Sequence, residues 1–410
     1  MQKWIKPILS QIFLILPMGC SGLEESMVSV PSSKIIEKKA QRLAKQLLIV
    51  DTHIDVPHRL VKEAEDISIR TEGGDFDYPR ARKGGLDAAF MSIFVPVRYQ
   101  ESGGAAEYAD KLIDMVIGFE RNWPNKFRVI RSVAEVQSLF GSGQVALAMG
   151  MENGAPLEGC LQNLKYFYDQ GVRYITLAHS LSNQISDSSY DSNRRWNGLS
   201  PFGREVVKEM NRLGIMIDIS HVSDEAFLQV IELTKAPILA SHSSCRHFTP
   251  GWERNMSDNM IRKLAAIGGV IQIAFGSSFI RNKYRLKNLQ RTKEIKRYLH
   301  SKGMKENDPD SSELIRQFKK TSSLELANVS EVLDHIDHVR DLVGIEHVGF
   351  GSDFDGVGDT MPEGLRDVSH YPNLIEGLLK RGYSEKEIQK ISSGNILRLW
   401  KEVERIAEKE

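Results

Sequence analysis

Short apolar runs alternate with segments of helical period along the chain from about residue 48. The apolar residues of these runs are mostly continuous, which is typical of strands buried on both faces. The predicted strands cover residues 48–55, 88–95, 145–151, 174–178, 215–219, 237–240, 269–274 and 347–351. Apolar residues at three- and four-residue spacing predict amphipathic helices over 105–121, 157–170, 202–213, 224–234 and 257–266.

This alternation predicts a parallel sheet covered by helices. Eight repeats favour a (β/α)8 TIM-type barrel over residues 46–410, with a doubly wound open sheet as the alternative. Two segments interrupt the pattern, at 59–83 and at about 276–322. The second is basic and aromatic, but its interspersed acids favour a solvated helical lid over a nucleic-acid or lipid surface. Residues 373–410 predict two or three closing helices.

The N-terminal segment has the pattern of an export signal. Lys3 and Lys6 precede the apolar run 8–16, and Gly19-Cys20 follows it. The run is too short to span a bilayer comfortably, and its Gly-Cys junction resembles the cleavage box of bacterial lipoproteins. We therefore expect a signal peptide over 1–19, lipidation of Cys20, and a linker over 20–45. The protein would be exported to the bacterial periplasm or cell envelope, with simple secretion or an uncleaved anchor as alternatives.

Charge and cysteine content limit the kinds of partner and metal site that the chain could have. The chain has 54 Lys and Arg against 54 Asp and Glu, so its formal net charge is zero. That balance removes the global electrostatic argument for nucleic acid and favours a small-molecule partner. The three cysteines are too scattered for a thiolate cluster, so any metal needs histidine and carboxylate ligands. No second apolar run could cross a membrane, so membrane contact is expected only through a lipid at Cys20.

Polar residues follow six of the eight predicted strands. They are found at 51–55, 152–153, 179–180, 220–221, 241–243 and 353–355. In a parallel barrel these ends converge on one mouth, where residues far apart in sequence meet. The sequence therefore predicts an active site there.

Histidines and carboxylates at these ends have the chemistry of a zinc site. His53 and Asp55 are two residues apart on an extended segment, so both point to the same side. Five ligands exceed what one catalytic zinc needs and suit two ions that a carboxylate bridges. We assign His53 and Asp55 to one Zn²⁺, His221 and His242 to the other, and Glu152 to both. A hydroxide between the ions would be the nucleophile.

Each of these residues taken singly has a structural explanation. A lone histidine at a strand end is usually a core or surface residue, and Glu152 alone could pair with an arginine. The joint arrangement is what favours a site. Asp51 is expected to cap backbone donors or to orient a ligand histidine. The remaining histidines are assigned no function; they are His58, His247, His300, His335, His338, His347 and His370.

The sequence resembles the membrane dipeptidase (renal dipeptidase) family of metal-dependent hydrolases, from about residue 48 to the C-terminus. The runs that carry the resemblance are 50–55, 150–152, 171–180, 218–223, 241–244, 254–255, 351–356 and 361–368. It implies the same two-zinc ligand set. It also implies that His179 lies near the scissile carbonyl, that Arg254 binds the dipeptide's terminal carboxylate, and that Asp353 lies beside the nucleophilic water.

These implied roles are chemically reasonable. Arginine offers a fixed fork for a carboxylate, which suits recognition of a free C-terminus. Asp353 would move the proton of the water and His179 would stabilise the oxyanion, which makes these two residues and Glu152 the catalytic set. A homodimer is compatible with the family. Leu181 stands where a cysteine often follows the His-Ser pair, so a disulfide-linked dimer of the mammalian kind is not expected.

Two other functions remain open from the sequence. One is a related binuclear amidohydrolase acting on acyl-amino acids, lactams or lactones. Another is a lipoprotein that binds peptide or metal without turnover. Arg254 and the run 361–367 favour dipeptides, and the absence of a His-x-His pair at the first strand disfavours the deaminase and phosphotriesterase branches.

Overall fold

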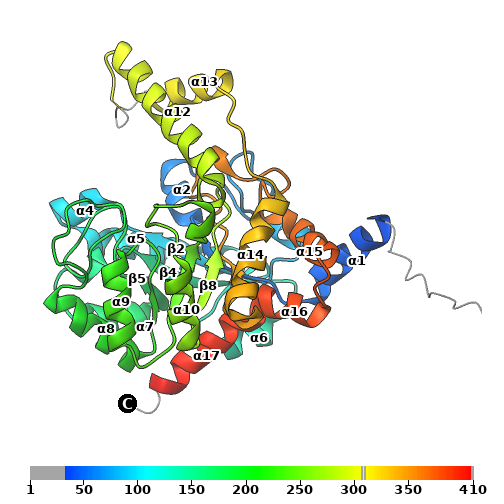
Figure 1. Cartoon of the computed structure of the whole chain (residues 1–410), viewed down its shortest axis with the longest axis horizontal. Coiled ribbons are helices and arrows are strands. Elements are labelled where there is room, and N and C mark those ends of the chain that lie inside the picture. Colours follow the sequence, from blue (N-terminus) through cyan, green and yellow to red (C-terminus); the bar gives the residue numbers. More distant parts are fainter. Residues whose placement is uncertain (1–32, 306–307, 309–310, 408–410) are drawn as a thin grey trace, which may run out of the picture.

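Eight parallel strands follow one another around a barrel in the computed structural model, which describes residues 33–305, 308 and 311–407 (Figure 1). The strands are β1 (Val50–Ile54), β2 (Ala88–Phe94), β4 (Val145–Glu152), β5 (Val172–Thr176), β6 (Met216–Asp218), β7 (Leu239–Ser243), β8 (Val270–Ile273) and β9 (Val348–Phe350). A parallel bridge between Ile54 and Phe354 joins the first strand to the chain after the last. The predicted barrel is confirmed, and the open-sheet alternative is wrong.

Helices cover the outside of the barrel and close its ends. They are α1 (Ser33–Gln46), α2 (Val56–Lys62), α3 (Tyr78–Gly84), α4 (Val97–Ser102), α5 (Ala105–Asn122), α6 (Val133–Leu139), α7 (Gln162–Gln170), α8 (Pro201–Leu213), α9 (Asp224–Leu233), α10 (Asp258–Ala266), α11 (Ser277–Ile280), α12 (Asn282–Ser301), α13 (Ser311–Thr321), α14 (Val329–Val343), α15 (Tyr371–Lys380), α16 (Glu385–Gln389) and α17 (Asn395–Ala407). Serine side chains fix several starts: Ser200, Ser223 and Ser257 accept hydrogen bonds from backbone N–H groups of α8, α9 and α10.

Three features differ from the sequence prediction. The linker expected over 20–45 is wrong for residues 33–45, because they form most of α1, which packs on α15 and buries Ala40, Leu43 and Ala44. The three-residue strand β3 (Phe127–Val129) pairs with β4 beside the barrel. It was not predicted, because three residues are too few to show a hydrophobic pattern. The helix expected from residue 157 begins at Gln162. The proposed signal peptide and Cys20 lie outside the described residues.

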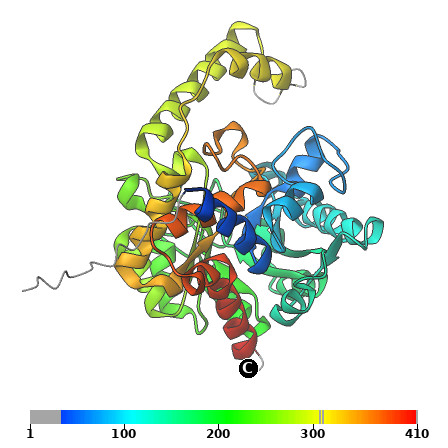
Figure 2. The same cartoon turned by 90° about the vertical axis from the view of Figure 1, so that its right-hand side faces the viewer.

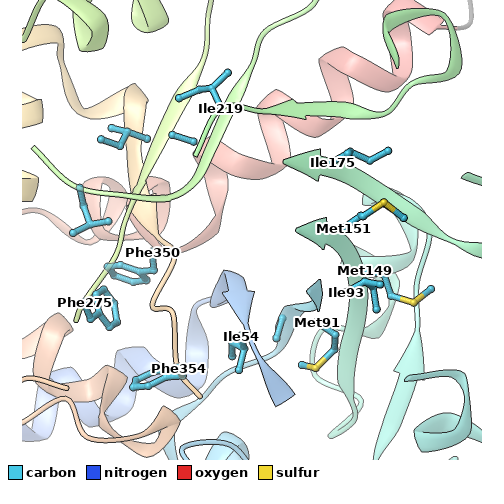
Figure 3. Packing of buried hydrophobic residues seen from close by; sticks show 14 of the residues in the cluster. Ile54, Met91, Ile93, Met149, Met151, Ile175, Ile219, Phe275, Phe350 and Phe354 are labelled. Carbon is cyan, nitrogen blue, oxygen red and sulfur yellow. The ribbon is translucent and has the colours of Figure 1, made fainter. Parts of the chain in front are cut away.

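Two apolar layers hold the barrel. Between strands and outer helices lie side chains such as Met91, Met149 and Ile175, drawn in Figure 3. Inside the barrel, the other face of the strands contributes small and large apolar residues. These residues pack on α17, whose Trp400 is fully buried. α17 lies at one end of the barrel in both views (Figures 1 and 2). The interior is therefore apolar at this end, which leaves the opposite mouth for polar groups.

The segment 276–322 contains α11, α12 and α13. In both overall views α12 and α13 form an arm that projects from the end of the barrel opposite α17 (Figures 1 and 2). Arg291 on α12 forms a two-point ion pair with Asp359 in the loop after β9, and this anchors the arm above the mouth.

Candidate metal centre and active site

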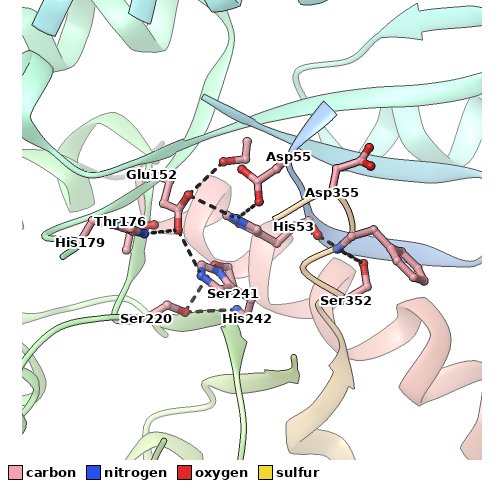
Figure 4. A network of polar contacts seen from close by, with 12 residues as sticks. His53, Asp55, Glu152, Thr176, His179, Ser220, Ser241, His242, Ser352 and Asp355 are labelled. Carbon is pink, nitrogen blue, oxygen red and sulfur yellow. Dashed lines mark hydrogen bonds and ion pairs between the residues drawn. The ribbon is translucent and has the colours of Figure 1, made fainter. Parts of the chain in front are cut away.

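The five predicted ligands lie together at the mouth of the barrel, and each is at most 7 % exposed. His53 Nε2 is 3.5 Å from Asp55 Oδ2 and 3.6 Å from Glu152 Oε2. The other oxygen of Glu152, Oε1, is 3.1 Å from His221 Nε2 and 3.3 Å from His242 Nε2. Glu152 thus turns one oxygen to His53 and the other to His221 and His242; Figure 4 shows Glu152 with His53 and His242. This is the arrangement that a carboxylate bridging two cations requires.

Two ligand atoms have no hydrogen-bond partner. His53 Nε2 and Asp55 Oδ1 are buried and make no hydrogen bond to any described residue. Buried polar atoms are nearly always satisfied in folded proteins, so such a group of exceptions needs an explanation. Metal ions at this mouth would supply the missing partners, and nitrogen with carboxylate oxygen is a donor set that zinc accepts. The residues present therefore fit the metals that the sequence predicts.

Hydrogen bonds fix which nitrogen of two ligands carries the proton. The Tyr174 hydroxyl donates to the carbonyl of Thr52 at 3.0 Å, so it accepts from His53 Nδ1, 2.7 Å away. Ser241 Oγ donates to Asp218 at 2.7 Å and lies 2.8 Å from Nδ1 of His242. Each Nδ1 is then the donor, and each Nε2 is directed at the site, where it can bind a metal. Such outer contacts orient metal ligands.

Tyr174 reaches His53 across the inside of the barrel, and Gly150 makes room for it. A Cβ atom at Gly150 would lie 1.9 Å from the Tyr174 ring. Any larger residue at 150 would displace the ring and remove the hydrogen bond to His53. The Gly150–Glu152 segment therefore supplies both the space and the bridging carboxylate.

Asp51 orients the backbone around His53, as the sequence predicts. Its Oδ1 accepts from the backbone N–H groups of His53 and Ser352, each at 3.0 Å. Tyr371 donates to its other oxygen. Asp51 therefore ties the end of β1 to the end of β9.

The pKa shifts of the ligand residues favour the binding of cations. Burial opposes ionisation of Glu152, but the neighbouring His179 and His53 outweigh it and hold its pKa well below the ordinary value. Burial and then the Arg254 charge lower the pKa of His221, and burial and then His53 lower that of His242. Despite burial, Tyr174, Glu152 and Asp55 raise the pKa of His53. Metal binding would displace a proton held there.

The loops at the mouth depart from ordinary backbone geometry. Asn153, His221, Asp353 and Asp355 all have positive φ, between 63° and 80°, and all follow barrel strands directly or within a few residues. Such strained residues gather at functional sites, where the fold must hold a side chain in one direction.

The three residues predicted to contact the substrate lie at different depths in the site. His179 Nε2 is 3.3 Å from Glu152 Oε1 and its ring borders the cavity. Asp353 lies with His53 and Asp55 in a group whose ligand atoms are within 4.8 Å of one another. Burial and then Asp55 raise its pKa well above the ordinary value. Arg254 lies deeper, 2 % exposed, with Nη1 on Ser243 Oγ at 2.9 Å.

A cavity of about 360 Å³ opens over these groups, within the size range of small-molecule sites. It is lined in part by side chains for which the sequence predicted no role, namely His58, Lys62, Phe94, Tyr190, Phe279 and Val357. His58 was assigned no function, but its ring borders the cavity, edge-on to Phe94 at 4.8 Å. Its position three residues after the predicted strand was the signal available. Tyr190 comes from a loop and Phe279 from α11, and neither position has a strand-end signature.

The match to a known family decides the identity. Residues 37–410 match the family described as membrane dipeptidase (peptidase family M19). The chain belongs to the membrane dipeptidase family. It is 31% identical to Dipeptidase 3 of Mus musculus over 383 residues, which cover 91% of this chain and 68% of that protein. Identity to Dipeptidase 3 of Homo sapiens is also 31%, over 92% of this chain and 70% of that protein. This family places the chain among zinc-dependent dipeptidases.

Solved structures agree with this membership. The probable dipeptidase PvdM from Pseudomonas aeruginosa has a TM-score of 0.77 and 27% identity, covering 91% of this chain and 100% of that one. A metallopeptidase from Rhodobacter sphaeroides, solved with a phosphinate mimic of the dipeptide L-Ala-D-Ala, has a TM-score of 0.71 and 26% identity. That similarity covers 87% of this chain and 99% of that one. Within the described residues, no helix is long and apolar enough to cross a membrane.

Proposed function

We propose that this protein is an exported dipeptidase that hydrolyses free dipeptides at a two-zinc site. The observation that carries the proposal is the position of Glu152, with Oε2 directed at His53 and Oε1 at His221 and His242. Bound zinc would lower the pKa of a shared water toward about 7 and polarise the peptide carbonyl. Binding of a dipeptide mimic by the Rhodobacter sphaeroides relative supports a dipeptide as the substrate.

The chain's own residues would complete the reaction. Asp353 is the proton acceptor, since it lies beside Asp55 and His53 on the side of the cavity where the water would be held. It would pass the proton to the leaving amine. His179, whose ring borders the cavity, donates a hydrogen bond to the developing oxyanion. Arg254 is the group that would receive the substrate's carboxylate, since its Nη2 lies 3.1 Å from Nε2 of His221, which lines the cavity.

An amidohydrolase acting on acyl-amino acids is less well supported, because the relative solved with a ligand holds a dipeptide mimic. Export rests on the N-terminal pattern of Lys3, Lys6, the apolar run and Cys20, and lipidation of Cys20 is part of the same proposal. Mass spectrometry of the mature N-terminus tests that part separately.

The direct experiment is a zinc-reconstituted hydrolysis assay with Ala-Ala, N-acetyl-Ala and a tripeptide. We expect release of free alanine from Ala-Ala alone, and loss of that activity when zinc is chelated. Bound zinc with no amino acid released from any dipeptide would refute the proposal and favour a binding protein. Preferred cleavage of N-acetyl-Ala would favour the amidohydrolase.

A further inference from the structure

A second pocket adjoins the catalytic cavity beneath α12. Its volume is about 400 Å³. It shares three residues with the catalytic cavity, Tyr190, Phe279 and Val357, so the two spaces have a common wall. Trp252 and Thr360 form other parts of it, and α12 contributes Arg285, Asn288 and Leu289. The arm that projects from the barrel mouth (Figure 1) therefore contributes three residues to a space beside the catalytic cavity.

Five of the nine residues around this second pocket are aromatic or aliphatic, and the other four are Ser278, Arg285, Asn288 and Thr360. The rings of Trp252 and Phe279 are stacked 5.4 Å apart at 4°, and Tyr190 meets Trp252 edge-on at 6.3 Å. The guanidinium of Arg285 lies over the Trp252 ring, 4.9 Å from its centroid. Leu289 is 46 % exposed and Tyr190 45 % exposed, although both face a hollow. Exposed apolar side chains in a concave site indicate an apolar ligand group.

Arg254 shows which part of a dipeptide would reach this pocket. Its guanidinium lies over the Phe279 ring, 5.0 Å from the centroid, and interacts with the Tyr190 side chain. Both residues beside Arg254 thus line the catalytic cavity as well as the second pocket. A residue whose carboxylate binds Arg254 has its Cα close to this wall. The side chain on that Cα belongs to the C-terminal residue.

We propose that the second pocket is an apolar subsite for the side chain of the substrate's C-terminal residue, and that α12 makes the enzyme prefer bulky apolar residues there. This inference rests on the proposed dipeptidase function. The segment that contributes Leu289 interrupts the strand and helix repeat of the barrel, so the preference is a property that the insertion adds to the common fold.

The zinc-loaded wild-type enzyme tests the preference with Ala-Ala, Ala-Phe and Phe-Ala. We expect kcat/KM for Ala-Phe to exceed that for Ala-Ala by about tenfold or more, within the range that hydrophobic pockets supply, and Phe-Ala to gain less. Equal values for Ala-Phe and Ala-Ala would overturn the subsite and leave the dipeptidase proposal intact. Failure to hydrolyse any of the three would refute the dipeptidase proposal itself and the subsite with it.

A pair of variants on α12 assigns the effect to the pocket. Leu289→Asp places a charge in the apolar wall, and the exposed position should tolerate it. We expect the Ala-Phe to Phe-Ala ratio of kcat/KM to fall about tenfold. Leu286→Asp is the matched control, since Leu286 is 53 % exposed on the same helix and faces a different groove. An unchanged ratio in Leu289→Asp, or an equal fall in Leu286→Asp, would overturn the assignment.

Discussion

The Nε2 atoms of His221 and His242 lie 2.7 Å apart, although they come from the ends of two different strands. His242 uses its Nδ1 in the contact with Ser241, so its Nε2 offers a lone pair. Burial lowers the pKa of both histidines, and a second proton is therefore disfavoured. A cation that both nitrogens share with Glu152 Oε1 resolves this arrangement, and the following predictions depend on it.

Tyr174→Phe should weaken zinc binding while the barrel stays folded. The change removes the acceptor that holds the Nδ1–H of His53, and loss of such an outer contact typically costs about 10–100-fold in metal affinity. Competition with a chromophoric chelator measures the affinity. Tyr383→Phe is the control, because that hydroxyl bonds Asp337 on the outer helices at 2.5 Å. Equal zinc affinity in wild type and Tyr174→Phe would contradict the role given to Tyr174.

Asp353→Asn should retain zinc and lose turnover. An amide cannot take the water's proton, and loss of a general base lowers kcat by about 10²–10⁴-fold. Zinc content and kcat for Ala-Ala are measured on the same preparation. Asp359→Asn serves as the comparison, since its carboxylate pairs with Arg291 above the mouth. Near-normal kcat in Asp353→Asn would remove this residue from the chemistry.

Arg254→Lys and Arg254→Ala should raise KM for dipeptides. A charge-assisted hydrogen bond contributes roughly 1.5–3 kcal/mol, equivalent to about 10–100-fold in binding, and lysine lacks the fork geometry. Ala-Ala-amide, which lacks the carboxylate, is the control substrate. The wild type should prefer Ala-Ala to the amide, and the variants should lose that preference. A KM for Ala-Ala that is unchanged in both variants would reject the carboxylate contact.

His335 should make the protein less stable as the pH falls. Burial lowers its pKa from 6.5 to about 3, and the neutral ring accepts from the Cys245 N–H while Nε2 donates to the Ile280 carbonyl, both at 3.0 Å. Above pH 6.5 neither state is protonated, so the full stability is present. Below it the unfolded chain binds a proton that the folded chain does not, which destabilises the fold by about 2 kcal/mol at pH 5.

Urea unfolding of wild type and His335→Gln at pH 7 and pH 5 measures this contribution. The metal ligands titrate in both proteins, so their effect cancels in the comparison. We expect the wild type to lose about 2 kcal/mol more than His335→Gln between the two pH values. His300→Gln, a change at an exposed position on α12, should behave like the wild type. Identical pH dependence in wild type and His335→Gln would contradict the neutral buried ring.

The barrel and the meeting of the five proposed metal ligands at its mouth were predictable because each depends on short, local patterns. Continuous apolar runs mark the strands, and a polar residue that follows one within two positions lies at the mouth, as Glu152 and His221 do. Tyr174 was not predictable, because an aromatic residue within a strand reads as core. Its role appears only when the barrel closes and Gly150 leaves room for the ring.

Other features depend on contacts between segments far apart in the sequence. The second pocket combines Tyr190, Trp252 and Leu289, which come from three different loops or helices and carry no common spacing. Arg254 was predicted as a substrate contact, but its burial against His221 and Phe279 could not be inferred from the order of residues. Most of α1 was predicted to be a linker, because charged residues surround its narrow apolar stripe. In the structure this stripe packs on α15.

Anomalous diffraction at the zinc edge, on crystals of the zinc-reconstituted protein, tests the central claim most directly. We predict two peaks about 3.5–4 Å apart, one on each side of the Glu152 carboxylate. In Glu152→Gln crystals the pair should be lost or reduced to one weaker peak. A single peak in the wild type, or two peaks that both lie away from Glu152, would contradict the two-zinc site.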